Sequence, residues 1–126
     1  MEKKISSYED LKVYHKLCDL HLGICTLSKN FPKFELYELG SQIRRSSNSI
    51  AANIAEGWNN KHVNIYLEGI NRAQAELQEK KHHLYMAYQK KYLPENVYRD
   101  YSDKYSECSR MLRGLEKSLL KWKSEK

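Results

Sequence analysis

Apolar side chains recur along this chain at spacings of three and four residues, in four separate stretches. Such spacing places them on one face of an α-helix, and that face must be buried against other elements. The sequence therefore predicts four helices and an all-α fold. The four apolar stripes are Val13, Leu17, Leu20, Ile24 and Leu27; Leu36, Leu39, Ile43, Ile50 and Ile54; Tyr66, Ile70, Ala73, Leu77 and Leu84; and Tyr98, Tyr101, Tyr105, Cys108, Leu112, Leu115, Leu119 and Trp122.

Residues that interrupt helices separate the stripes. Pro32 disfavours a helical residue before it, Gly57 suits a C-terminal cap, and Pro94 suits the first turn of a helix. We place the helices at about 8–29, 35–56, 61–91 and 95–122. Short connections make consecutive helices antiparallel, so we expect an up-down-up-down four-helix bundle. It forms a single domain that spans residues 1–126.

The chain has no stretch near the roughly 18 apolar residues of a membrane span, and its N-terminal segment lacks the apolar run of a signal peptide. Of the three cysteines, Cys18 and Cys25 lie seven residues apart on one expected helix. Their Cα atoms would be about 10 Å apart, which is too far for a disulfide. Free thiols are typical of a reducing compartment, so we expect a cytoplasmic protein with no membrane partner.

A metal site is one chemical possibility, because one side of the first helix carries either His15, Cys18 and Cys25 or Cys18, His21 and Cys25. Structural zinc sites usually gather ligands from two or more elements, often as closely spaced cysteine pairs. Apolar burial of the cysteines is therefore favoured, and we expect no metal and no cofactor. The chain also has no Gly-rich phosphate loop, paired acid motif or serine with a positioned base, so we do not expect an enzyme.

The first helix carries a second apolar line beside its stripe, formed by Leu11, Cys18, Leu22 and Cys25. A helix that is apolar over more than one face must bury the remainder elsewhere. The chain also has ten tyrosines, and tyrosine is common at interfaces. We therefore expect a homo-oligomer. A thick core with partly exposed tyrosines is the alternative.

The formal net charge of +6 raises the possibility of an anionic partner. Antiparallel pairing of neighbouring helices would bring five arginines to one height, near residues 73–76. These arginines could bind phosphates, because the guanidinium group forms bidentate hydrogen bonds with phosphate oxygens. Asp19 and Glu76 fall at the same height, and internal pairing with them is the stronger interpretation. The five residues are Arg44, Arg45, Arg72, Arg110 and Arg113.

Two further basic groups stand out. The segment 80–91 contains four lysines and no acidic residue, and a basic line follows one face of the last helix at spacings of three, four and four. A solvated helix face would explain both groups equally well. If the protein binds nucleic acid, RNA or DNA, the candidate residues are Arg44, Arg45, Arg72, Lys80, Lys81, Arg110, Arg113, Lys117 and Lys121. The alternative function is a protein-interaction scaffold whose tyrosine and apolar surfaces hold a partner protein.

Residues 31–33, 37–45 and 49–57 resemble the four-helix-bundle family named for intervening sequences in bacterial large-subunit ribosomal RNA genes. Shorter matches occur at residues 8–13, 76–77, 111–112 and 114–115, so the resemblance spans nearly the whole chain. Arg45, Asn53 and Glu56 match motif positions. The chain departs from the family at residues 46–48, Ser-Ser-Asn, where small apolar residues are more usual.

The resemblance implies a bundle that forms a ring-like homopentamer. The family is related to the accessory protein of diversity-generating retroelements, a basic pentamer that binds nucleic acid and a reverse transcriptase. The family's own function is poorly defined. Together with the basic charge, the resemblance leads us to expect a non-enzymatic oligomer that binds nucleic acid, with structured RNA favoured.

Overall fold

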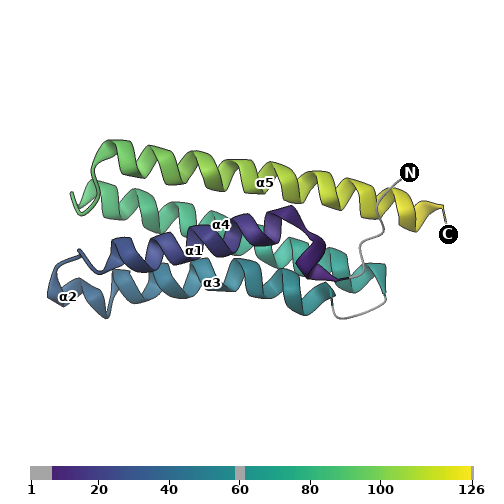
Figure 1. The fold of residues 1–126 in the computed structure, drawn as a ribbon, viewed down its shortest axis with the longest axis horizontal. Coiled ribbons are helices and arrows are strands. Elements are labelled where there is room, and N and C mark those ends of the chain that lie inside the picture. The colour runs from purple at the N-terminus through teal and green to yellow at the C-terminus, as the bar shows by residue number, and fades with distance from the viewer. Residues whose placement is uncertain (1–6, 59–61, 126) are drawn as a thin grey trace.

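A computed structural model of the chain describes residues 7–58 and 62–125. Within these residues, four long helices pack side by side and no strand occurs, so the fold is an all-α helical bundle (Figure 1). A 3₁₀ turn, η1, and a one-turn helix, α2, complete the described elements. The bounds are η1 Tyr8–Asp10, α1 Lys12–Ser28, α2 Lys33–Leu36, α3 Leu39–Trp58, α4 Val63–Gln89 and α5 Glu95–Ser124.

The first helix begins at Lys12, later than the expected residue 8. The turn before it is closed by reciprocal capping: the Ser7 hydroxyl accepts a hydrogen bond from the Glu9 amide, and the Asp10 carboxylate accepts one from the Ser7 amide. A 3₁₀ turn capped in this way satisfies its own backbone donors. The extended backbone of Leu11 separates this turn from α1.

The expected second helix, 35–56, is two helices in the structure. α2 ends at Leu36, and α3 begins at Leu39 and continues to Trp58. Gly57 therefore lies inside α3 and does not cap it. The expected third and fourth helices, 61–91 and 95–122, are Val63–Gln89 and Glu95–Ser124. Residue 61 of the expected third helix lies outside the described residues.

The apolar stripes form the core, and its most deeply buried side chains come from all four long helices. The stripe of α5 leaves the core towards its C-terminal end, where Trp122 is 38% exposed and the helix runs past the start of α1 (Figure 1). The stripe residues with at most 1% exposure are Leu17, Ile24, Ile43, Ile50, Ile54, Ile70, Ala73, Leu77, Leu84, Tyr105, Cys108 and Leu112.

Figure 1 also shows how the helix ends are distributed. The end of α3, the start of α4 and the end of α5 lie at one end of the molecule, and α2 lies at the other end with the α4–α5 turn. In that turn Lys91 adopts a positive φ of 66°.

No helix in residues 7–58 and 62–125 is both long and apolar enough to cross a membrane.

Candidate nucleic-acid interface

The outer side of α5 carries an uninterrupted basic line, which we define as Arg110, Arg113, Lys117 and Lys121. All four side chains are exposed and lie away from the buried Tyr105 and Leu112. The spacings of three, four and four put them on one face, because an α-helix has about 3.6 residues per turn. The ion pairs among the described residues include none of the four side chains, although Arg110 is near enough to Glu107 to help lower the pKa of that carboxyl. The α5 basic line is therefore open to an external anion.

Arg44 is not part of such a surface. Its guanidinium donates one hydrogen bond to the Ser28 hydroxyl at 2.9 Å and another to the Leu36 carbonyl at 3.0 Å. These contacts tie α3 to the end of α1 and to α2. The pairing is internal, as the stronger interpretation expected, but its acceptors are not Asp19 or Glu76.

The register of α3 and α4 also separates the expected cluster of arginines. The Lys80 Nζ reaches the Ile43 carbonyl oxygen, so Arg44 and Arg45 lie about level with residues 79–80 and not with 73–76. The reason is that α3 continues to Trp58 and α4 begins only at Val63, which moves the midpoint of the hairpin along the chain.

Arg45 and Arg72 line the outer groove between α3 and α4, at two different places. Arg45 lies with Glu76 and Glu79, whereas Arg72 forms an ion pair with Glu68 one turn earlier on its own helix. Burial and the neighbouring Glu79 carboxylate raise the pKa of Glu76. The five arginines therefore do not form one cluster: Arg44 makes internal hydrogen bonds, Arg45 and Arg72 lie at two places along the groove, and Arg110 and Arg113 lie on α5.

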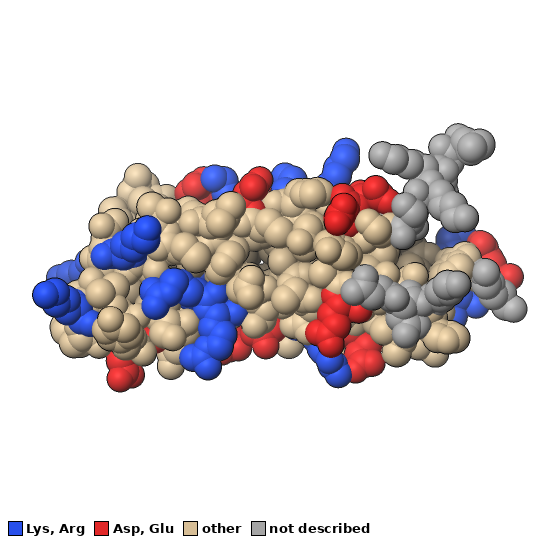
Figure 2. Space-filling model, turned by 60° about the horizontal axis from the view of Figure 1, so that its bottom comes forward, with Lys and Arg blue, Asp and Glu red and all other residues tan. Residues whose placement is uncertain are grey.

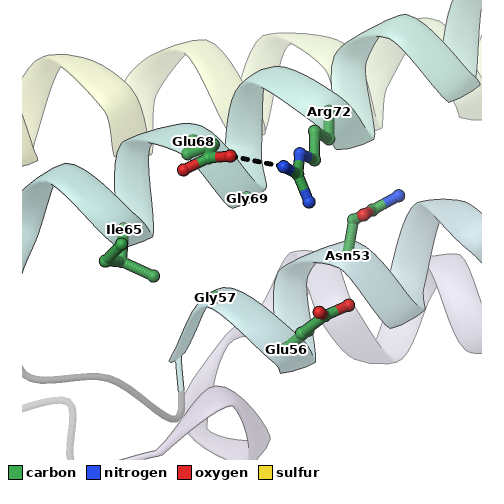
Figure 3. A pocket seen from close by; sticks show the side chains of 7 residues that line it. All are labelled: Asn53, Glu56, Gly57, Ile65, Glu68, Gly69 and Arg72. Carbon is green, nitrogen blue, oxygen red and sulfur yellow. Dashed lines mark hydrogen bonds and ion pairs between the residues drawn. The ribbon is translucent and has the colours of Figure 1, made fainter.

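The part of this α3–α4 groove around Gly57 and Gly69 has a volume of about 220 Å³ (Figure 3). A Cβ on Gly69 would lie 2.8 Å from the Asn53 carbonyl oxygen and 3.3 Å from the Gly57 Cα, so only glycine permits this close approach. The two glycines form the floor, and the side chains of Asn53, Glu56, Ile65, Glu68 and Arg72 form the walls.

Polar groups of both signs occupy the walls of the groove. The Asn53 amide donates to the Ser49 carbonyl at 2.8 Å, which leaves its side-chain oxygen for other donors. Two carboxylates face one guanidinium, so this part of the groove has no excess positive charge. Three of its seven lining residues, Asn53, Glu56 and Gly57, belong to the segment that carries the family resemblance, and this part of the groove does not suit a phosphate.

Two expected phosphate-binding lysines have other roles. Lys80 is completely buried, so the prediction that it belongs to a nucleic-acid-binding face is wrong. Its helix turns this position towards α3. The signal was present in the sequence, because Lys80 fills the gap between Leu77 and Leu84 in the α4 stripe at spacings of three and four. Lys81 is half-buried and donates to the Ser106 hydroxyl at 2.8 Å, which links α4 to α5.

The cysteine and histidine side chains of α1 do not gather as metal ligands. The His21 Nδ1 lies 2.7 Å from the Ser47 hydroxyl, and its Nε2 lies 3.7 Å from the Cys25 sulfur. Burial and the nearby Lys80 lower the pKa of His21. In the described part of the chain, no three His, Cys, Asp or Glu side chains are close enough together to hold a metal ion.

One surface was missed by the sequence interpretation. Phe34 and Tyr37 on and after α2 are among the most exposed large side chains, beside the exposed Lys29 and Lys33. The expected helix begins at residue 35, after Phe34. The signal that could have found Phe34 is the interruption between the two apolar stripes, residues 28–35, which holds aromatic and basic residues together.

Comparison with known proteins agrees with the resemblance. The family model described as "23S rRNA-intervening sequence protein" matches residues 9–114. A crystal structure of a protein of unknown function from the S23 ribosomal protein family of Bacteroides thetaiotaomicron VPI-5482 is similar, with a TM-score of 0.73 and 24% identity. The similarity covers 83% of this chain and 98% of the other, and at this identity it supports the fold alone. No curated protein matches the chain. Because the family model covers most of the sequence, the chain belongs to the 23S rRNA-intervening sequence protein family.

Proposed function

We propose that this protein is a non-enzymatic, cytoplasmic RNA-binding oligomer that contacts phosphates through the α5 basic line. The carrying observation is that Arg110, Arg113, Lys117 and Lys121 are exposed on one face and have no ion-pair partner among the described residues. Such residues can exchange bulk solvent for phosphate oxygens without first breaking an internal salt bridge.

The line has dimensions that suit a nucleic-acid strand. Lys121 follows Arg110 by eleven positions, which is about 16 Å along a helix. A single strand carries a charge roughly every 3.4 Å, so several phosphates fall within that length. The family is named for an rRNA sequence, which is why RNA is chosen over DNA for the first test.

The proposal includes an antiparallel up-down-up-down bundle that assembles with copies of itself. Five copies is the number that the family resemblance implies. On α1, Leu22 is 64% exposed between the half-buried Cys18 and Cys25, which leaves an apolar surface to cover. Leu11 is buried within the bundle and contributes nothing to that surface, contrary to the expected apolar line. A ring would present several α5 basic lines to one RNA, and this would raise the overall affinity.

The phosphate contact is tested by filter binding of a structured RNA. Changing Arg113→Gln together with Lys117→Gln should weaken binding about tenfold or more, because two charge-assisted contacts are lost. The matched control is Arg99→Gln with Lys104→Gln, also on α5, whose charges are paired with Glu95 and Asp100. Equal losses in the two variants would show that only net charge matters. No loss in the first would overturn the proposal.

Assembly is tested separately by light scattering. The chain mass is 15.0 kDa, and five copies would give about 75 kDa (5 × 15.0 kDa). A mass of 15.0 kDa at micromolar concentration would contradict assembly without affecting the phosphate contact.

The second candidate function is a protein-interaction scaffold, favoured by the exposure of Leu120 and Trp122 beyond the core of the bundle. Its test is a pull-down from nuclease-treated lysate with the wild type and the Leu120→Ser variant. One protein retained by the wild type and lost by the variant would support it.

A further inference from the structure

The short helix α2 presents two aromatic rings to solvent. Phe34 is 73% exposed and Tyr37, the residue after the helix, is 86% exposed. Tyr37 keeps a helical backbone conformation, so the two side chains, three residues apart, lie on the same side of the turn. We call this pair and the turn that carries it the α2 platform.

Hydrogen bonds on the inner side of α2 fix the platform to the rest of the bundle. Glu35 lies between Phe34 and Tyr37 in the sequence, but its side chain points inward and is 6% exposed. Its carboxylate accepts hydrogen bonds of 2.9 Å from the Lys90 Nζ and the Tyr92 hydroxyl. The carbonyl of Leu36 accepts from Arg44. These contacts anchor α2 to α3 and to the α4–α5 turn. The rings are therefore displayed on an ordered support.

Exposed lysines lie close in sequence to the rings and in the neighbouring α4–α5 turn. Lys29, Lys33 and Lys91 are exposed, and Figure 2 shows basic side chains gathered towards the end of the molecule where α2 lies in Figure 1. Of the two acidic residues between 29 and 38, Glu35 is already paired with Lys90, and Glu38 is exposed. The exposed charge near the rings is therefore positive on balance.

The small size of the surface decides what can occupy it. Two aromatic side chains can bury about 300–500 Å² of surface in a contact. A stable protein–protein interface buries about 800 Å² of surface on each partner. Lysine is also depleted at protein interfaces. A nucleic-acid base is smaller and flat, stacks on any aromatic face, and brings a phosphate for a neighbouring lysine.

We propose that Phe34 and Tyr37 stack against unpaired bases of an RNA, with Lys29 and Lys33 contacting the adjacent phosphates. This inference rests on the proposed RNA binding and adds a substrate class to it. The ligand would be an RNA with a single-stranded segment next to its structured part, and the unpaired segment would lie at the α2 end of the bundle.

The experiment compares an oligoadenylate single strand with an RNA duplex of equal length, both fluorescently labelled. Replacing both rings, Phe34→Ala with Tyr37→Ala, should weaken single-strand binding by about thirtyfold or more, because two stacked bases are lost at about 1–3 kcal/mol each. Duplex affinity should stay within about twofold, since paired bases cannot stack on a protein ring. The control is Tyr85→Ala, which removes another exposed ring, on α4.

The outcomes separate this inference from the proposed function. If the wild type binds neither RNA, both fail. If it binds both RNAs and the α5 variants lose affinity but the ring variant does not, only the stacking inference is overturned. An equal loss on both RNAs also overturns it. A fall in the light-scattering mass of the ring variant would identify the α2 platform as a contact between copies and would overturn it too.

Discussion

The Nζ of Lys80 donates a hydrogen bond of 3.0 Å to the carbonyl oxygen of Ile43, at a position with no exposed side-chain surface. Burial lowers the pKa of this lysine well below its usual value. The titratable groups that face it are His21 and Cys25 on α1 and Tyr105 on α5, and none is a carboxylate. Among residues 7–58 and 62–125, this buried amine therefore has no counter-ion.

We expect Lys80→Met to stabilise the bundle by about 1–3 kcal/mol at pH 7, because a similar volume is filled without burying an amine. The Ile43 carbonyl keeps the Ser46 hydroxyl as a donor, so it is not left unsatisfied. Urea denaturation of both proteins measures the difference.

The same variant has a pH signature. Between the lowered pKa of native Lys80 and its usual value of 10.5, the unfolded chain binds one more proton than the native chain. The free energy of unfolding of the wild type therefore rises with pH in that range, by about 1.4 kcal/mol per pH unit. The advantage of Lys80→Met should shrink as the pH approaches 10.5. A pH-independent difference would show that Lys80 is protonated in the native core.

The close approach of α3 and α4 predicts opposite effects for two glycine substitutions. Gly69→Ala would place its Cβ 2.8 Å from a backbone oxygen, so we expect it to destabilise the bundle by about 1–3 kcal/mol despite the better helix propensity of alanine. Gly114→Ala meets nothing within 4 Å and should stabilise by up to about 1 kcal/mol. Thermal unfolding of both variants is the measurement. If both were stabilising, the two helices would be farther apart than described.

Neighbouring arginines on α3 should behave differently. Arg44→Met removes two hydrogen bonds that join α3 to α1 and α2, and we expect a loss of about 1–3 kcal/mol in unfolding free energy. Arg45→Met changes an exposed side chain and should cost less than about 0.5 kcal/mol. Urea titrations of the pair test this, and a larger loss for Arg45 would contradict the assignment of Arg44 as the internal partner.

The contact beneath α2 predicts a loss of stability in acid. The Lys90 ammonium, and then the Tyr92 hydroxyl, hold the pKa of Glu35 below its usual 4.5. The unfolded chain therefore takes up a proton first, and the stability given by this contact is lost as the pH falls from about 4.5 through the native value. Glu35→Gln should remove that part of the pH dependence. The exposed Glu38→Gln serves as control, and identical acid profiles for the two variants would contradict the contact.

The sequence was informative where packing follows periodicity. The apolar stripes are buried as their spacing predicts, because residues spaced by three and four lie on the same face of a helix. Examples are Leu17 and Ile24, Ile43 and Ile54, and Leu77 and Leu84. Charged residues were interpreted less well. Lys80 lies three residues after Leu77 and four before Leu84, so the α4 stripe passes through it, but its charge made the position look solvated.

The candidate site was predicted in part for a similar reason. The α5 basic line depends only on spacing within one helix. The expected cluster of arginines depended on the register between α3 and α4, which is fixed by the Gly57–Gly69 approach and by the end of α3 at Trp58. The α2 platform depends on tertiary hydrogen bonds of Glu35 and Arg44, which no local pattern specifies.

The central proposal is that the α5 basic line binds phosphates, and the salt dependence of RNA affinity tests it most directly. For the wild type, log K should fall linearly with log salt concentration. Replacing all four residues of the line by glutamine should reduce the magnitude of the slope of log K against log salt concentration by about 3 for each α5 basic line that contacts the RNA. Each lost phosphate contact lowers that magnitude by about 0.7–0.9. The same steepness in both proteins, or no RNA binding by the wild type at low salt, would contradict the proposal.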